Sequence, residues 1–220
     1  MDTSAVLFDI DGTLVDSTYH HALAWHRAFT RLGHVPAMWR IHRSIGMGGD
    51  KLVAQVAGPE VEERHGDDLR DSWRQEYLRV RAEVRPLDGA ATLIRALSDD
   101  GMRVGLASSG DPQFAREAVE LLGIGDRTEV LTTSEDADDS KPEPDLITVT
   151  LDRMGGVEEA VLVGDTPYDV EAANRAGIAC IALLTGGFSS AELVEAGAVL
   201  VAEAPDDLIG ARWPEYLTRL

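Results

Sequence analysis

Two aspartates stand two residues apart directly after a short apolar run. The run spans residues 5–8, and the five residues that follow it are DIDGT, at positions 9–13. Residues two apart on an extended chain point to the same side, so Asp9 and Asp11 can reach one site. Paired carboxylates repel each other unless a cation lies between them, and oxygen ligands of this kind suit Mg²⁺. The alternative is a plain turn, since Asp, Gly and Thr are common turn residues.

One lysine stands out in an acidic stretch. The chain has only two lysines, Lys51 and Lys141, and Lys141 precedes a predicted helix. Pro142 and Pro144 restrict the local backbone and hence the direction of the side chain. An ammonium group held there would bind a phosphoryl oxygen. The alternative is a solvated lysine whose positive charge balances the surrounding acidic residues. We interpret the acidic run 135–139 itself as a solvated face rather than a second metal site.

Polar residues also follow the apolar run 104–107. Ser108, Ser109 and Gly110 come directly after it and precede a predicted helix. A hydroxyl and free backbone N–H groups at the start of a helix form a pocket for an anion. The alternative for this segment is a helix N-cap and nothing more.

A fourth polar segment follows the apolar run 160–163. Asp165 stands at the end of that run, and Asp169 lies four residues later, in the first turn of a predicted helix. One of these carboxylates would contact a metal ion directly and the other through a bound water. The alternative, helix capping by Asp165 with Pro167 in the first turn, is compatible with metal binding.

The elements that must position these residues are strands and helices in alternation. Short apolar runs indicate strands covered on both faces, at 5–8, 103–107, 129–131, 160–163, 178–183 and 198–201. Helical patterns lie between them, at 114–122, 146–154 and 170–176. The alternation predicts an α/β fold, a Rossmann-like parallel sheet with helices on both faces. All four polar segments then meet at one edge of the sheet.

One region interrupts the alternation. Between about residues 16 and 85 we find no strand pattern, and apolar residues recur at helical spacing over 22–32 and 69–84. We therefore expect an all-helical cap, residues 16–86, inserted into an α/β core formed by 1–15 and 87–220. An insertion after the first strand would lie over the crevice in which such sheets bind ligands.

Composition excludes several classes of protein. The 220 residues carry a formal charge of −19, so phosphate backbones and anionic lipids would repel the chain. We expect no nucleic-acid partner and no membrane partner. There is no uninterrupted apolar stretch of about 18 residues and no signal-peptide pattern, which predicts a cytoplasmic protein. The single cysteine, Cys180, lies in an apolar run and is expected to be a small buried residue.

The order of the four segments resembles that of the haloacid dehalogenase-like hydrolase superfamily. The branch with a helical cap after the first motif, which includes phosphoglycolate phosphatase and β-phosphoglucomutase, is the most similar. The resemblance covers essentially the whole chain, with the key residue of every motif present. It implies a Mg²⁺-dependent phosphatase that hydrolyses a small phosphorylated metabolite through an aspartyl-phosphate.

The resemblance also implies a role for each residue. Asp9 would be the nucleophile, and Asp11 would protonate the leaving oxygen and then deprotonate the attacking water. Ser108 would bind phosphoryl oxygens, and Lys141 would neutralise charge on Asp9 and on the phosphoryl group. The expected Mg²⁺ ligands are Asp9, the backbone carbonyl of Asp11, Asp165 and, through water, Asp169. Further candidate substrate contacts are Gly12, Thr13, Ser109 and Gly110.

Alternatives within and outside the family remain. Dehalogenation is disfavoured because that branch lacks the second aspartate, which is present here as Asp11. A phosphonate-cleaving enzyme would need a cap lysine, for which Lys51 is the only candidate. A phosphomutase of the β-phosphoglucomutase type is the main rival, although the cap arginine of that group is missing from the stretch 45–50. A non-catalytic phosphate-binding module is the alternative from another class.

Substrate choice is expected to depend on the cap. The candidate residues are His20, His21, Trp25, Arg43 and Lys51. Each has a structural alternative, and Trp25 in particular shares a helical stripe with Ala22 and Phe29. We expect a monomer or a homodimer.

Overall fold

The structure is a computed structural model that describes residues 3–220. Its contacts divide the chain into two units. The larger unit contains the chain up to residue 16 together with residues 86–220, and the smaller unit is residues 17–85. The chain leaves and re-enters the larger unit at two short strands that pair with each other, β2 (Val15–Asp16) and β3 (Arg85–Pro86).

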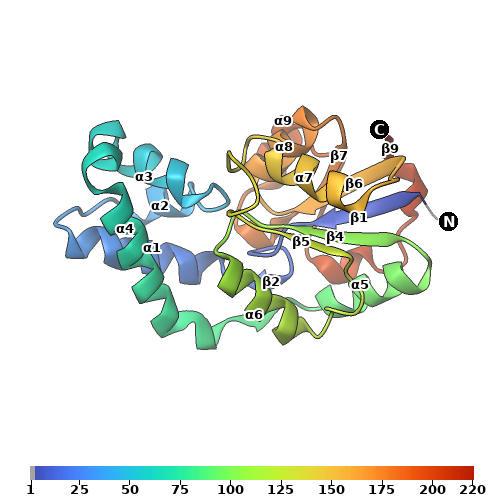
Figure 1. The fold of residues 1–220 in the computed structure, drawn as a ribbon, viewed down its shortest axis with the longest axis horizontal. Coiled ribbons are helices and arrows are strands. Elements are labelled where there is room, and N and C mark those ends of the chain that lie inside the picture. The colour runs from blue at the N-terminus through green and yellow to red at the C-terminus, as the bar shows by residue number, and fades with distance from the viewer. Residues whose placement is uncertain (1–2) are drawn as a thin grey trace. The chain divides into compact units, whose positions relative to one another are not determined.

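The larger unit is built on a mixed sheet with six parallel strands (Figure 1). In spatial order these are β5 (Val130–Thr132), β4 (Arg103–Ala107), β1 (Ser4–Phe8), β6 (Glu159–Gly164), β7 (Ala179–Leu183) and β8 (Leu200–Ala202). Residues 5–8 of β1 pair with residues 103–106 of β4 and with residues 160–163 of β6. All six strands predicted from the sequence are confirmed, each within two residues of its expected bounds.

Two strand details differ from the expectation. A short strand near the end of the chain, β9 (Thr218–Arg219), runs antiparallel to the start of β6. The prediction of no strand between about 16 and 85 is wrong at its two ends, where β2 and β3 lie. Elements of two residues bury too little apolar surface to leave a pattern in the sequence.

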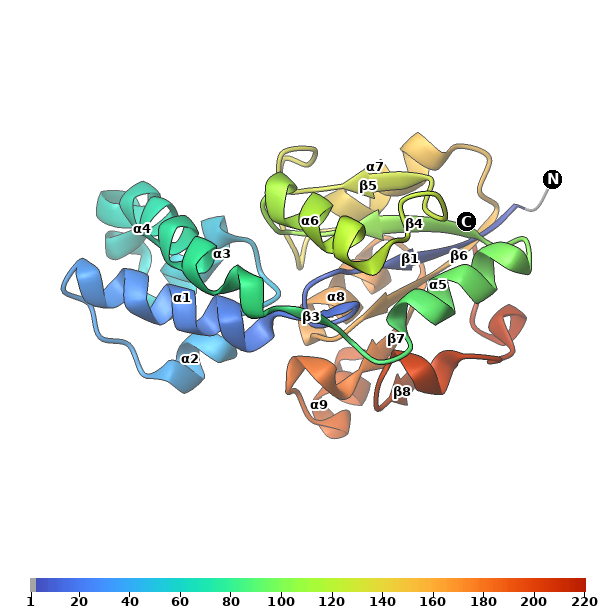
Figure 2. The same ribbon diagram turned by 90° about the horizontal axis from the view of Figure 1, so that it is seen from below.

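Helices cover both faces of the sheet (Figures 1 and 2). One face carries α5 (Ala90–Asp99) and α6 (Pro112–Leu122), and the other carries α7 (Asp145–Met154), α8 (Pro167–Arg175) and α9 (Ser190–Ala196). Short 3₁₀ turns complete the unit: η2 (Leu184–Gly186), η3 (Pro205–Leu208) and η4 (Trp213–Glu215). This arrangement confirms the predicted α/β class, because both faces of the central strands are buried.

The helix α8 begins three residues before its predicted start. Thr166 is its N-cap, and the Thr166 hydroxyl accepts a hydrogen bond from the backbone N–H of Asp169. The Asp169 carboxylate accepts in return from the Thr166 backbone, which completes a capping box. The alternative role for Asp165 as the helix cap is therefore wrong, since the residue after it caps the helix.

The smaller unit is helical. It contains α1 (Thr18–Arg31), α2 (Met38–His42), α3 (Gly49–Ala57), α4 (Pro59–Val80) and the 3₁₀ turn η1 (Arg81–Glu83). Its core packs apolar residues of all four helices, among them Trp25, Phe29 and Leu69. The ring of Trp25 stacks on Trp73, which confirms the interpretation of Trp25 as a core residue.

Two further findings bear on the sequence analysis. Cys180 is completely buried on β7, as expected, and burial raises the pKa of its thiol. Within residues 3–220, no helix combines the length and the apolar content that a membrane crossing requires.

Gly105, in the middle of the sheet, lies where the core leaves no room for a side chain. A Cβ on Gly105 of β4 would lie 2.8 Å from Leu7 Cδ2 and 2.9 Å from both Met154 Sδ and Thr150 Cγ2.

We expect Gly105→Ala to lower the free energy of unfolding by about 1–3 kcal/mol, because the added methyl group overpacks the β1–β4–α7 contact. Urea unfolding measures the loss. Gly125→Ala is the matched control, since its Cβ would meet nothing closer than 3.7 Å; equal losses for the two variants would contradict the packing argument.

Candidate active site

The sheet topology brings the four polar segments to one edge. The chain runs from β1 to β4 and β5 on one side and then returns to β6 on the other side of β1. The order of the strands therefore reverses beside β1, and such switch points are where open α/β sheets bind ligands. Asp9 follows β1 directly, and its backbone N–H donates to the carbonyl of Val163 in β6 at 2.9 Å.

Lys141 comes from the loop between β5 and α7 and is almost completely buried, at 1% exposure. Its Nζ lies 2.5 Å from Asp9 Oδ1 and 2.7 Å from Asp169 Oδ1. Lys141 is thus the shared ion-pair partner of two carboxylates that lie 160 positions apart in the chain. The alternative of a solvated lysine is wrong.

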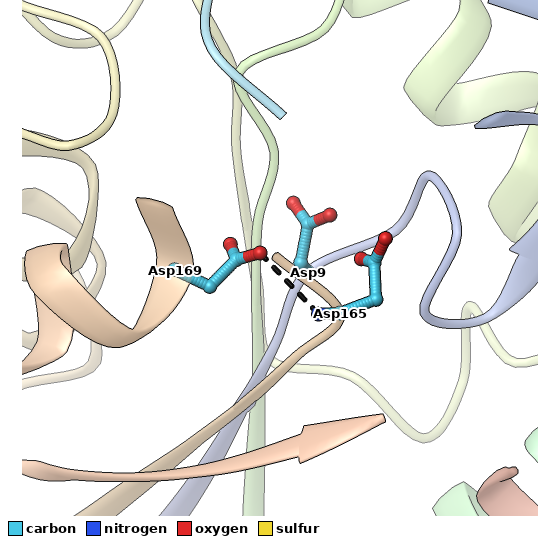
Figure 3. Close-up of side chains that lie close together, drawn as sticks. All are labelled: Asp9, Asp165 and Asp169. Atoms are coloured by element: carbon cyan, nitrogen blue, oxygen red, sulfur yellow. Dashed lines mark hydrogen bonds between the residues drawn. The ribbon is translucent and has the colours of Figure 1, made fainter. Parts of the chain in front are cut away.

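Asp9, Asp165 and Asp169 form a buried carboxylate cluster (Figure 3). One oxygen from each of the three lies within 4.8 Å of the others, the only such group found among residues 3–220. The capping box of α8 fixes Asp169 within it. Asp169 Oδ2 accepts from the Thr166 hydroxyl at 2.6 Å and from the backbone N–H groups of Thr166 and Asp165 at 3.0 and 3.3 Å.

Asp165 is completely buried, and its two oxygens have different surroundings. Oδ1 accepts a hydrogen bond from the Thr13 hydroxyl at 2.6 Å. Oδ2 is buried and has no hydrogen-bond partner in the described part of the chain. A buried carboxylate oxygen without a donor is costly, unless a cation takes the place of the donor.

Burial dominates the electrostatics of the cluster. It raises the pKa of Asp9 to about 7, although the neighbouring Lys141 ammonium acts in the opposite direction. Burial and the carboxylates of Asp169 and Asp9 raise the pKa of Asp165 well above its ordinary value. Burial alone would lower the pKa of Lys141, but Asp169 and Asp9 outweigh it and raise that pKa. Three buried carboxylates therefore share one fixed ammonium group, and a divalent cation would correct the imbalance.

The donor set of this cluster fits Mg²⁺. The candidate ligands are carboxylate oxygens without sulfur or imidazole nitrogen, which is the chemistry of a hard cation. Asp165 Oδ2, the oxygen without a hydrogen bond, is available to such a cation. The Asp11 carboxylate is not one of the three in this cluster, and a metal contact through the Asp11 backbone carbonyl stays a prediction.

The Asp11 carboxylate lies beside the segment that follows β4. A Cβ on Gly110 would be 3.1 Å from Asp11 Oδ2 and 3.0 Å from Ser108 Oγ, so these groups surround one glycine. Ser108 is buried and accepts from the Gly110 backbone N–H at 3.0 Å. Ser109 Oγ is buried without a hydrogen-bond partner in residues 3–220. The helix cap here is Asp111, which accepts from the N–H of Gln113, so the hydroxyl groups of the two serines are not used for capping.

The acidic run 135–139 is mostly a solvated face, as predicted. Glu135, Asp138 and Asp139 are exposed. Asp136 is the exception, because it accepts from Thr133 N–H and Oγ at 2.8 and 2.9 Å and pairs with Arg153 at 2.6 Å. The Arg153 hydrogen bond lowers the pKa of Asp136. Asp136 thus fixes the loop that leads to Lys141.

The predicted cap residues lie in the smaller unit. His21 is buried and stacks on Tyr77, with ring centroids 4.0 Å apart, so its ring is part of an aromatic stack. Arg43 follows α2 and Lys51 lies in the first turn of α3, both half-buried. His20 is half-buried on α1. Their roles in substrate choice stay predictions.

Sequence reasoning missed the loop after β7. A Cβ on Gly186 would overlap the Asp165 side chain and its carbonyl oxygen, and the Thr185 hydroxyl donates to the carbonyl of Gly12. The Thr13 hydroxyl donates to Asp165, and the predicted contact of Thr13 with substrate stays a prediction. No local pattern predicts these contacts, because the two hydrogen bonds join residues more than 150 positions apart and the Gly186 contact joins two different loops.

Comparisons with known proteins agree with the resemblance of the motifs. The family model "Haloacid dehalogenase-like hydrolase" matches residues 6–183. A validoxylamine A 7'-phosphate phosphatase of Streptomyces hygroscopicus subsp. limoneus is 32% identical over 94% of this chain and 95% of its own. A phosphoglycolate phosphatase of Aquifex aeolicus is 27% identical over 78% and 80%. The crystal structure of a hydrolase from Pseudomonas syringae, 31% identical, superimposes with a TM-score of 0.88 over 94% of this chain and 96% of that one.

The raised pKa of Asp9 predicts how pH and Mg²⁺ act on stability. Between about pH 4 and 7 the raised pKa means that the folded protein holds a proton on Asp9 that the unfolded chain releases, so the contribution of Asp9 to stability falls as pH rises through this window. A cation needs the ionised carboxylate and therefore competes with that proton. We expect Mg²⁺ to raise the Tm more at pH 8 than at pH 5, as measured by thermal unfolding.

Asp165→Asn serves as the control for that measurement, because it removes one charge and one ligand oxygen from the cluster. The Mg²⁺-induced rise in Tm should be lost at both pH values in this variant. An equal rise at pH 5 and pH 8 in the unchanged protein would contradict the linkage between Asp9 and the metal.

Proposed function

The chain belongs to the haloacid dehalogenase-like hydrolases as a phosphoric monoester hydrolase, and we propose that it cleaves a small phosphorylated metabolite through an aspartyl-phosphate, with Mg²⁺ as cofactor. The observation that carries the proposal is the contact of Asp9 with Lys141 inside the carboxylate cluster. A nucleophilic carboxylate, a fixed ammonium group and a set of hard oxygen ligands meet at one point.

Asp9 is the nucleophile of the proposed reaction. Lys141 holds Oδ1, so Oδ2 is the oxygen that attacks phosphorus. The Lys141 ammonium stabilises the ionised form of Asp9 against the effect of burial and stays beside the charge that develops on the phosphoryl group. When bound at Asp9, Asp165 and Asp169, Mg²⁺ would neutralise charge on the phosphoryl oxygens.

Asp11 is the general acid and base. As the bond from phosphorus to the leaving oxygen breaks, Asp11 gives its proton to that oxygen and the alcohol departs. Asp11 then takes a proton from water, whose oxygen attacks phosphorus and releases Asp9 and inorganic phosphate. The position of Asp11 next to Ser108 and Gly110 supports this role, since the hydroxyl and N–H donors of that segment suit the phosphoryl oxygens.

The relatives support hydrolysis of small phosphate esters rather than a phosphomutase reaction. The Streptomyces and Aquifex proteins are named as phosphatases of small molecules. A panel of such esters, including phosphoglycolate and hexose phosphates, would identify the substrate class. Phosphorus NMR of the products separates release of inorganic phosphate from isomerisation of the ester.

Replacing the nucleophile tests the covalent step. We expect Asp9→Asn to abolish phosphate release from p-nitrophenyl phosphate in the presence of Mg²⁺, because an amide oxygen does not form the acyl phosphate. The control is Asp100→Asn, which changes an exposed aspartate at the end of α5 and should keep full activity. Circular dichroism shows whether both variants are folded. Turnover by folded Asp9→Asn at the unchanged rate would exclude the proposed nucleophile.

Replacing Asp11 tests the acid role separately. A good leaving group needs little protonation, so Asp11→Ala should lower kcat for alkyl phosphates by roughly 10²-fold or more, and for p-nitrophenyl phosphate by much less. The measurement is a series of esters whose leaving groups differ in pKa. If all esters lose the same factor, Asp11 has a structural role and not that of the acid.

A further inference from the structure

Thr13 and the loop after β7 enclose Asp165 from two sides. The Thr13 hydroxyl donates to Oδ1 at 2.6 Å, and both residues are completely buried. Oδ2, in contrast, has no hydrogen-bond partner within residues 3–220. The side chain therefore has one oxygen that is engaged and one that is available.

Gly186 lies close against the Asp165 carboxylate on the side of Oδ2. There is room only for hydrogen at its Cα, because a Cβ would overlap Asp165 Oδ2 and the Asp165 carbonyl oxygen. The φ angle of Gly186 is not positive, so glycine is needed here for space and not for backbone conformation. Thr185 joins this loop to the β1 loop through its hydrogen bond to the Gly12 carbonyl.

The other two carboxylates of the cluster are also restricted. Asp9 Oδ1 is held by Lys141 at 2.5 Å. Asp169 Oδ2 accepts three hydrogen bonds, and Asp169 Oδ1 pairs with Lys141. Each carboxylate of the cluster therefore has at least one oxygen held by a protein donor. For Asp165 that donor is a neutral hydroxyl group.

This restriction distinguishes between divalent cations. Ca²⁺ accepts six to eight oxygen ligands in flexible geometry and often takes both oxygens of a carboxylate, whereas Mg²⁺ demands an octahedral set of single oxygens. We propose that Thr13 confines Asp165 to one ligand oxygen, and that the Thr13–Gly186 enclosure thereby makes the site select Mg²⁺ over Ca²⁺. This inference rests on the metal site of the proposed function, and it makes Thr13 a positioning residue.

The test is direct titration of the two cations into the protein, without substrate. We expect Thr13→Val, which keeps the shape but removes the donor, to weaken Mg²⁺ binding by roughly tenfold or more, as loss of an outer hydrogen bond to a metal ligand commonly does. Ca²⁺ binding should weaken less, since the released Oδ1 becomes a second ligand. The ratio of the Ca²⁺ Kd to the Mg²⁺ Kd should therefore fall, while Thr13→Ser should restore it.

Two matched variants separate positioning from packing. Thr150→Val removes another buried hydroxyl, which donates to the Leu146 carbonyl within α7, and should leave both Kd values unchanged. Gly186→Ala should weaken Mg²⁺ binding through crowding, even if Thr13→Val fails to fold. Thermal unfolding with each cation gives an independent readout.

The outcomes distinguish the two proposals. If Mg²⁺ binds the unchanged protein but Thr13→Val and Gly186→Ala leave the cation ratio unaltered, the inference is wrong and the proposed function stands. If neither cation binds the unchanged protein, both the selectivity and the metal site of the proposed function are overturned. Loss of Mg²⁺ and Ca²⁺ affinity by the same factor shows that Thr13 supports the site without selecting the ion.

Discussion

The structure depends on one electrostatic constraint: three buried carboxylates share one fixed ammonium group. Asp9, Asp165 and Asp169 lie at the carboxyl edge of the sheet, where burial opposes their ionisation, and Lys141 contacts only two of them. Like charges held this closely in a medium of low polarity are stable only with further positive charge or with bound protons. The raised pKa of Asp9 corresponds to stabilisation by a bound proton. A divalent cation would stabilise the cluster in the other way, by adding positive charge. The same imbalance that costs stability favours the binding of a cation, as the proposed function requires.

Hydrogen bonds, rather than further charged side chains, hold the carboxylates of this cluster in place. The capping box that begins α8 also fixes Asp169, so helix formation and the orientation of this carboxylate use the same contacts. Thr13 does the same for Asp165 across two loops. Parallel strands make this possible, because their carboxyl ends bring segments from the start, middle and end of the chain to one edge.

The sequence predicts those parts of the fold and site that are encoded locally. The six parallel strands appear as apolar runs, and each polar segment follows one of them, so the meeting of Asp9, Lys141 and Asp165 follows from strand topology. The apolar pattern places the start of α8 three residues too late, because the capping box lies within the polar motif 164–169. The contacts of Thr13 and Gly186 with Asp165 join distant segments, and their residue types are ordinary in loops. Only the three-dimensional structure assigns them.

The choice of lysine at position 141 follows from the same geometry. Of the 20 basic residues only two are lysines, so arginine is the ordinary cation of this chain. Arginine presents a planar fork that matches one carboxylate with two parallel hydrogen bonds, whereas an ammonium group is a compact charge whose donors diverge. Lys141 places a single nitrogen 2.5 Å from Asp9 and 2.7 Å from Asp169. A guanidinium group in this space would pair with one of the two carboxylates and displace the other. Position 141 is therefore one at which a single ammonium nitrogen, and not a guanidinium fork, satisfies both neighbouring carboxylates.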